Sequence, residues 1–141
     1  MQTFLPYPNF RESAACLDYK RLGKQRVEAK QILTILLGQA KPNKKGNIAW
    51  SNHPAVKMWK DHEETLKLYF NVISEEWIKR NYRHNMGFYS IDRKNINYPP
   101  WIGVDRFHSA HRSNLLRKDF EFYRKYGWTE PTDLPYIWPI S

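Results

Sequence analysis

Residues 17–31, LDYKRLGKQRVEAKQ, decide the fold and carry much of the charge of the chain. The stretch holds five cations, two carboxylates and two glutamines, and it continues into the apolar run ILTILLG. An α-helix over residues 20–37 would turn about 100° per residue, which gathers the apolar side chains on one side. The sequence therefore predicts an amphipathic helix with one face in the core.

The polar face of this helix places a carboxylate among cations. The projection gathers four polar side chains there, namely Lys20, Lys24, Glu28 and Gln31, with Arg21 at the edge of the face. One interpretation is a solvated surface, on which a Lys24–Glu28 pair would contribute a few tenths of a kcal/mol. The other is that the cations bind phosphates while Glu28 moves protons or stabilises charge beside them. These cations are Lys20, Arg21, Lys24 and Arg26.

Length and composition predict one basic domain over residues 1–141. A chain of 141 residues can bury roughly 68–70% of the surface that its unfolded form exposes. The net charge of +9 and the pI near 9.7 indicate an anionic partner, nucleic acid before membrane. No stretch approaches the roughly 20 apolar residues of a membrane span, and no signal peptide is recognisable. We therefore expect a soluble, cytoplasmic protein that does not bind membranes.

The first part of the chain predicts a short and a long helical stretch. Asn9 and Glu12 form the pattern of a capping box, which starts the first helix. This helix either kinks near Gly23 or breaks into a short helix followed by the long one. Gly38 is typical of a helix C-cap and ends the apolar run.

The second part of the chain completes an all-α fold of three main helices joined by long loops. A second helix of about 25 residues is predicted to start at residues 51–54, SNHP, and to include Trp77. The third covers residues 104–118, and a short aromatic helix and an extended tail follow. In the linker over residues 81–101, aromatic rings alternate with cations. Such a linker either stacks on unpaired bases or folds onto its own rings.

The third helix carries two histidines on its apolar face. His108 and His111 are either core histidines with their hydrogen bonds satisfied or functional groups, and no carboxylate or cysteine joins them in a metal-site pattern. As an acid and base pair, they would suit a phosphodiesterase. Arg112, Arg117 and Lys118 give the same helix a cationic edge suited to phosphates.

Three segments carry a family resemblance. They are DYKRLGK at residues 18–24, WSNHP at residues 50–54 with the helix up to Tyr82, and FYRKYG at residues 122–127. They are similar, in order, to Glu-Tyr-Arg-Glu-Leu-Pro-Arg, to a Gly-His segment with a long second helix, and to Trp-Tyr-Lys-Tyr-Tyr-Gly. These are motifs of the pyrimidine dimer DNA glycosylases of the phage endonuclease V type. A bacterial branch of that family resembles the chain more closely, in MxTFLP, RLGKQRVE, NHPAVxMW, PPW and HRSNLLRK.

The resemblance implies an endonuclease V-like fold and a DNA glycosylase with AP lyase activity on pyrimidine bases dimerised by ultraviolet light. In the family, an N-terminal α-amine attacks the sugar C1′, an imine forms as the base leaves, and β-elimination cuts the strand. A glutamate on the first helix stabilises charge and moves protons. The implied partner is double-stranded DNA with a damaged base, bound by a monomer without metal or other cofactor.

The chain departs from the family pattern at the glutamate. Arg21 stands in its place, and Glu28, two helical turns later on nearly the same face, is the nearest replacement. Asp18 is the second candidate, although helix capping also explains a carboxylate there.

The N-terminus is the other departure. The phage enzyme exposes a threonine once its initiator is removed, whereas Gln2 is bulky, so we expect Met1 to stay and to supply the amine. An α-amine has an ordinary pKa of roughly 7.7–8.0, which leaves a neutral fraction for attack. Lys20 or Lys24, with a pKa lowered by neighbouring cations, is the alternative nucleophile.

These observations give the predicted site. The catalytic residues are Met1, Glu28, His108 and His111. The DNA-binding residues are Lys20, Arg21, Lys24, Arg26, His53, Arg112, Arg117 and Lys118. Besides the phosphodiesterase, the alternative function is a DNA- or RNA-binding module without catalysis, as Arg21 in the glutamate position would suggest.

Overall fold

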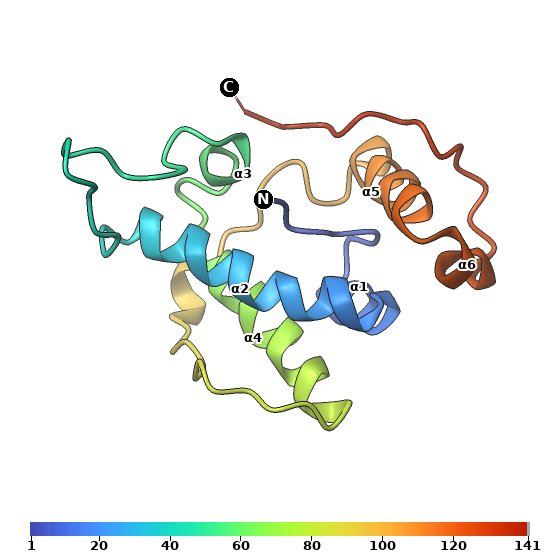
Figure 1. Ribbon diagram of the computed structural model, residues 1–141, viewed down its shortest axis with the longest axis horizontal. Helices are drawn as coiled ribbons and strands as arrows, with labels where there is room; N and C mark the ends of the chain where they lie inside the picture. The colour runs from blue at the N-terminus through green and yellow to red at the C-terminus, as the bar shows by residue number, and fades with distance from the viewer. Residues whose placement is uncertain (141) are drawn as a thin grey trace.

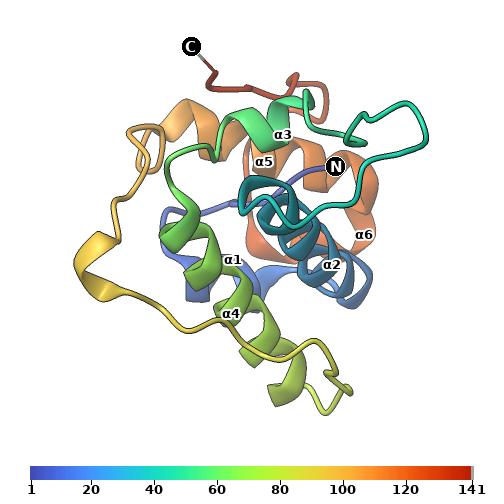
Figure 2. The same ribbon diagram turned by 90° about the vertical axis from the view of Figure 1, so that its left-hand side faces the viewer.

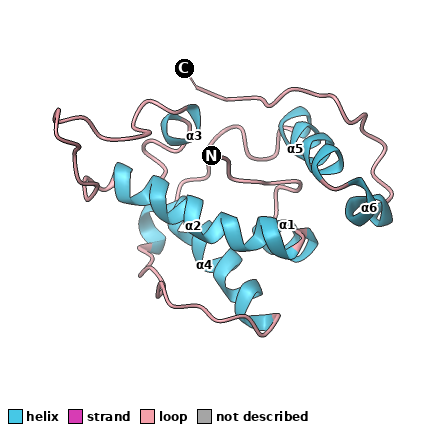
Figure 3. Cartoon of the chain, viewed as in Figure 1, coloured by secondary structure: helices cyan, strands magenta, loops and turns pink. Residues whose placement is uncertain are grey.

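The computed structural model describes residues 1–140, which form helices and loops without a β-strand (Figure 3). The helices are α1 (Phe10–Cys16), α2 (Tyr19–Leu36), α3 (Pro54–Lys57), α4 (Glu63–Lys79), α5 (Asp105–Lys118) and α6 (Phe120–Tyr123). Two 3₁₀ turns, η1 (Arg93–Asn95) and η2 (Arg124–Tyr126), lie in the connections. The predicted all-α class is confirmed, with α2, α4 and α5 as the main helices. Along this described stretch, no helix is both long and apolar enough to span a bilayer.

An extended N-terminal segment, residues 1–6, runs through the middle of the helices (Figures 1 and 2). Thr3 and Leu5 are fully buried, and Gln2 is also buried. Pro6 fixes its own backbone angle and keeps the residue before it extended. Since this segment belongs to neither a helix nor a sheet, its buried N–H and C=O groups need partners from elsewhere in the chain.

The break between α1 and α2 settles the alternatives predicted around Gly23. The short-then-long arrangement is confirmed, but the break lies at Leu17, which is extended, and α2 continues through Gly23. Asp18 starts α2 because its side chain accepts a hydrogen bond from the N–H of Arg21. Gly23 has a packing role, since a Cβ there would lie 3.0 Å from the ring of Trp77 on α4.

The prediction of one helix of about 25 residues from residue 51 was wrong, because the chain turns between α3 and α4. Asp61 takes a left-handed conformation, with φ of 69°, and ends the turn before α4. The turn buries Trp59, whose Nε1 donates to Oγ1 of Thr3 at 3.0 Å. Trp59 before the turn and Leu66 after it are both fully buried. The apolar pattern therefore continues across the turn, and for this reason the sequence pattern did not predict it.

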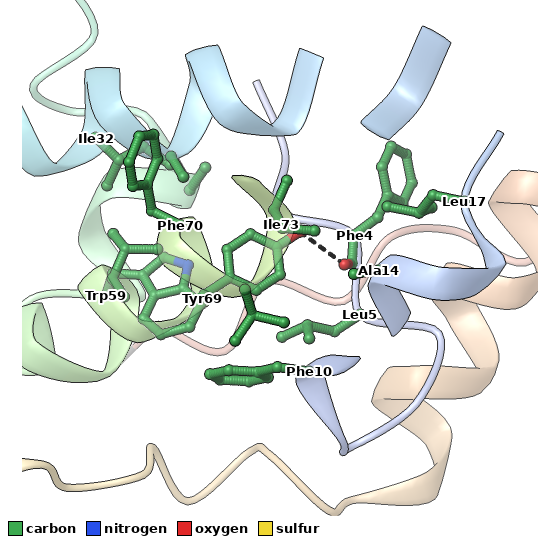
Figure 4. Packing of buried hydrophobic residues seen from close by; sticks show 14 of the residues in the cluster. Phe4, Leu5, Phe10, Ala14, Leu17, Ile32, Trp59, Tyr69, Phe70 and Ile73 are labelled. Atoms are coloured by element: carbon green, nitrogen blue, oxygen red, sulfur yellow. Dashed lines mark hydrogen bonds between the residues drawn. The ribbon is translucent and has the colours of Figure 1, made fainter. Parts of the chain in front are cut away.

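The core lies where α4 crosses α2, around the N-terminal segment (Figure 4). Tyr69 of α4 is fully buried, and its hydroxyl lies 2.8 Å from the C=O of Phe4. Tyr69 packs between the rings of Phe10 and Trp59. The N-terminal segment therefore lies between the core residues of α4 on one side and α5 on the other.

Rings of the linker after α4 fold onto other rings of the chain, which is one of the two predicted arrangements, and stacking on unpaired bases stays a prediction. Tyr89 packs on Phe70 with ring centroids 5.2 Å apart, so this part of the linker folds onto the core. Tyr98 lies against Phe10, although it stays largely exposed. Tyr82 lies at the surface directly after α4.

We expect Asp18→Ala to lower the free energy of unfolding by about 2 kcal/mol, since it removes the cap of α2 and leaves the buried hydroxyl of Tyr123 without its acceptor. Urea denaturation measures this change. Asp92→Ala, which removes the cap of the exposed turn η1, should change it by much less. Equal effects of the two substitutions would contradict the role given to Asp18.

Candidate active site

A pocket of about 560 Å³ lies beside the start of the chain. Its walls come from the N-terminal segment, from the polar face of α2, from the end of α5 and from the tail. The charged and terminal residues that line it are Met1, Lys20, Arg21, Lys24, Glu28, Lys118 and Asp119. The pocket thus brings together one predicted catalytic pair, Met1 and Glu28, and four of the predicted DNA-binding cations.

Glu28 is held by the N-terminal segment rather than by a cation. Its Oε2 accepts from the backbone N–H of Gln2 at 3.3 Å and from Nε2 of Gln25 at 3.1 Å. The predicted surface pair with Lys24 does not form, and no ion pair within residues 1–140 involves Glu28. The carboxylate therefore stays available to a group in the pocket while its orientation is fixed by two amide donors.

Gln25 links the pocket to the core, and the sequence analysis missed it. Its Oε1 accepts from the N–H of Phe4 at 2.8 Å and lies 2.8 Å from the hydroxyl of Tyr69, and its Nε2 donates to Glu28. Only 1% of Gln25 is exposed. The sequence feature that could have indicated Gln25 is its position: a polar residue next to the apolar face of α2, three positions before Glu28.

Asp18, the second candidate for the family glutamate, does not line the pocket. It is buried at the start of α2, where it accepts from Tyr123 and pairs with Arg21 at 3.2 Å. These contacts account for the carboxylate as a cap, so the pocket offers Glu28 as its only acidic side chain from α2.

His108 and His111 bind the backbone of Leu5 and do not line the pocket. Nδ1 of His108 donates to the C=O of Leu5 at 2.8 Å, and its Nε2 accepts from the N–H of Gly103. Nδ1 of His111 accepts from the N–H of Leu5 at 2.8 Å. Both rings are almost completely buried. These contacts position the N-terminal segment, and a catalytic role for either ring stays a prediction.

The comparison with protein families bears on this arrangement. The family described as pyrimidine dimer DNA glycosylase matches residues 1–90, which include the N-terminal segment, α2 and α4. The chain belongs to the pyrimidine dimer DNA glycosylase family. Neither the curated proteins nor the solved structures provide a match. The family supports a DNA glycosylase activity in general, with DNA as the partner, and α5 with its cations lies beyond the matched residues.

Four cations of this glycosylase share the rim of the pocket, and they act on one another. Burial lowers the pKa of Lys118, and the charges of Arg21, Lys24 and Arg117 lower it further, while Glu28 opposes them. Lys118 therefore lies close to cations from α2 although it belongs to α5. Such crowding of like charges favours an anion between them.

The remaining predicted cations of the glycosylase have protein partners outside the pocket. Arg26 lies over the ring of Trp77, at 4.4 Å from its centroid. Arg112 pairs with Glu130 and donates to the C=O of Pro6, so it supports the N-terminal segment. Arg117 donates to Asn114 and to Thr132 at the edge of α5. The structure does not bring these three to the pocket lining.

His53 lies near the predicted catalytic pair, Met1 and Glu28, without lining the pocket. Its Nδ1 accepts from the N–H of Ala55 and so starts α3. Burial lowers the pKa of His53, and the positive N-terminal amine lowers it further, while Glu28 raises it. Both charges therefore act on this ring. In residues 1–140, no group of three or more His, Cys, Asp or Glu side chains is placed to hold a metal ion.

The stability of the glycosylase should fall with acid because of His111. Burial lowers the pKa of His111 from 6.5 to about 3, so between these pH values the unfolded state binds one more proton than the folded state. The free energy of unfolding then falls by up to about 1.4 kcal/mol per pH unit as the pH drops through this range. His111→Asn keeps an acceptor for Leu5 and removes the titration. Urea denaturation at pH 7, 6, 5 and 4 should show a shallower fall for the variant, and identical slopes would contradict this assignment.

Proposed function

We propose that the protein is a bifunctional DNA glycosylase and AP lyase, formed by one domain over residues 1–141, with the α-amine of Met1 as nucleophile. The observation that carries the proposal is the 3.3 Å contact between the N–H of Gln2 and Oε2 of Glu28. It joins the start of the chain to a carboxylate inside a pocket that Met1 lines and cations surround. A deoxyribose in this pocket would meet an amine and an acid together.

The chemistry follows from this pair. The neutral amine attacks C1′ of the sugar, an N–C1′ bond forms, and the bond from C1′ to the base breaks with its electron pair leaving on the base. The attached nitrogen gives one proton to the departing base. The C1′–O4′ bond then breaks as the nitrogen lone pair forms the C=N bond, O4′ takes up a proton, and a protonated imine results. Glu28 then removes a proton from C2′, and the C3′–O3′ bond breaks to release the 3′ phosphate. Water hydrolyses the imine and frees the amine.

The surroundings of the pocket suit a damaged base in DNA. A damaged or unpaired base costs less to remove from the stack than a paired one, which favours lesions over normal DNA. Lys20, Lys24 and Lys118 would bind the phosphates beside the sugar, since they line the pocket around Glu28. Arg21 occupies the family position of the glutamate and would add a further phosphate contact, because its pairing with Asp18 leaves it on the pocket wall.

A second candidate is a DNA-binding module without catalysis. It is favoured by Arg21 itself, which replaces the family carboxylate with a cation on the pocket wall. This module would bind DNA with a strong dependence on salt and would leave the strand intact. The phosphodiesterase alternative has no such support, because His108 and His111 lie in the core with backbone partners.

Incubation with abasic-site DNA and borohydride should yield a covalent adduct of the wild-type protein. Mass spectrometry of the adduct peptide identifies the nitrogen, with Met1 expected and Lys20 and Lys24 as the alternatives. Glu28→Gln should slow strand cleavage by a factor of about 100 or more, since general acid and base groups contribute at least this much. Glu75→Gln, the same change on an exposed position of α4, should cleave at the wild-type rate. DNA binding without any adduct would favour the non-catalytic module.

Phosphate contacts should appear in the salt dependence of binding. We expect Lys24→Gln and Lys118→Gln each to reduce the slope of log affinity against log salt by about 0.9 for duplex DNA, because each removes one phosphate contact. Fluorescence anisotropy on duplexes at several salt concentrations measures this slope. Lys57→Gln on α3, which does not line the pocket, should leave the slope unchanged. Unchanged slopes for the two pocket variants would remove them from the DNA interface.

A further inference from the structure

Four side chains stack along the flank of α2 that faces away from the pocket. The rings of Tyr82 and Trp77 are stacked with centroids 4.3 Å apart, and the guanidinium of Arg26 covers the Trp77 ring at 4.4 Å. Tyr19, the first residue of α2, is stacked on Tyr82 at a wider centroid distance of 6.3 Å. We call Tyr19 and Tyr82 the tyrosine clamp. Their planes differ by only 26°, so the two rings are nearly parallel.

One side of the tyrosine clamp is anchored, and the other is free to adjust. Trp77 sits on Gly23 and donates from Nε1 to the C=O of Arg83 at 2.8 Å, which fixes the ring beneath Tyr82. Tyr19 is 54% exposed, and Tyr82 is 40% exposed. A ring inserted between two others needs about 6.8 Å, twice the base rise of about 3.4 Å in DNA. Because Tyr19 is exposed, rotation of its side chain would let a base enter between the two rings.

A positive charge beside the clamp lacks an anion. Arg26 makes no ion pair with any residue in the range 1–140, and its buried Nε has no hydrogen-bond partner. Its Nη1 contacts Nδ1 of His84, a neutral acceptor, since an arginine can only donate. A phosphate would supply the missing anion. Rings with a cation at their edge are the arrangement that binds unpaired bases and the backbone next to them.

The clamp and the pocket lie on opposite flanks of one helix. At about 100° per residue, Tyr19, Gly23 and Arg26 share one side of α2, whereas Arg21, Lys24 and Glu28 share the other. Lys20 is exposed on the ridge between them. An α-helix with side chains is about 10–12 Å wide, which corresponds to about three nucleotides along a strand.

We propose that the tyrosine clamp binds an unpaired base of the DNA strand, about three nucleotides from the sugar in the pocket, with Arg26 near the adjoining phosphate. The base must be unpaired because the faces of a paired base are already stacked in the duplex. This proposal rests on the proposed function for the position of the sugar. It adds a second recognition element, which selects DNA that is locally opened beside the lesion.

Fluorescent DNA tests the clamp directly. The probe is a duplex with a stable abasic analogue and a single 2-aminopurine, placed one to six nucleotides from the analogue and opposite either thymine or a gap. Stacking on a tyrosine should quench the fluorophore most strongly at about three nucleotides and only where it is unpaired. Tyr19→Ala and Tyr82→Ala should abolish this position dependence and weaken binding of the gapped duplex about tenfold or more. Tyr19→Phe and Tyr82→Phe keep the rings and should behave as the wild-type protein.

Tyr98→Ala is the matched control, because Tyr98 is 56% exposed but lies against Phe10 away from α2. It should bind and quench as the wild-type protein does. Quenching without position dependence, or Tyr19→Ala binding with wild-type affinity, would overturn the clamp. If Tyr19→Ala and Tyr82→Ala lost as much affinity for fully paired DNA as for the gapped duplex, this would also overturn the clamp, because the rings would then contact the duplex surface. Borohydride trapping by the wild-type protein separates the two proposals: an adduct without a clamp signal removes only the clamp, and a clamp signal without an adduct removes only the lyase.

Discussion

The structure depends on the hydrogen bonds of a buried, extended segment at the start of the chain. Residues 2–6 lie in the core without a neighbouring strand, and each unpaired backbone group there would cost about 1–3 kcal/mol. Side chains from three helices supply the partners, namely Gln25 and Glu28 from α2, Tyr69 from α4, and His108, His111 and Arg112 from α5. The same contacts that satisfy the backbone fix where the first residues lie, so packing and the geometry of the pocket have one origin.

The pocket combines a carboxylate, which is held by neutral hydrogen-bond donors, with cations that repel one another. Glu28 is oriented by amide donors that carry no charge, whereas Lys118 and its neighbours repel one another around it. A polyanion bound among these cations would relieve that repulsion. No cation within the described residues pairs with this carboxylate directly.

Sequence reasoning reached the features that depend on neighbours along the chain. The amphipathic pattern of α2 placed Glu28 on the same face as Lys20 and Lys24, and the third helix was predicted within one residue. Features that depend on distant residues were missed. Gln25 matters because Phe4 is its partner, Arg26 is held by Trp77, and the turn at Asp61 accompanies the contact of Trp59 with Thr3. No local pattern encodes such contacts, and the apolar period even continued across that turn.

The pairing of Leu5 with His111 joins residues 106 positions apart, and this has a consequence for synthesis. The ribosome synthesises Leu5 106 residues before its partner His111 on α5. Until α5 is made, the nascent chain contains Met1 and Glu28 but lacks the hydrogen bonds from His108 and His111 that position the N-terminal segment. Incomplete translation products that end before α5 would therefore lack an assembled pocket.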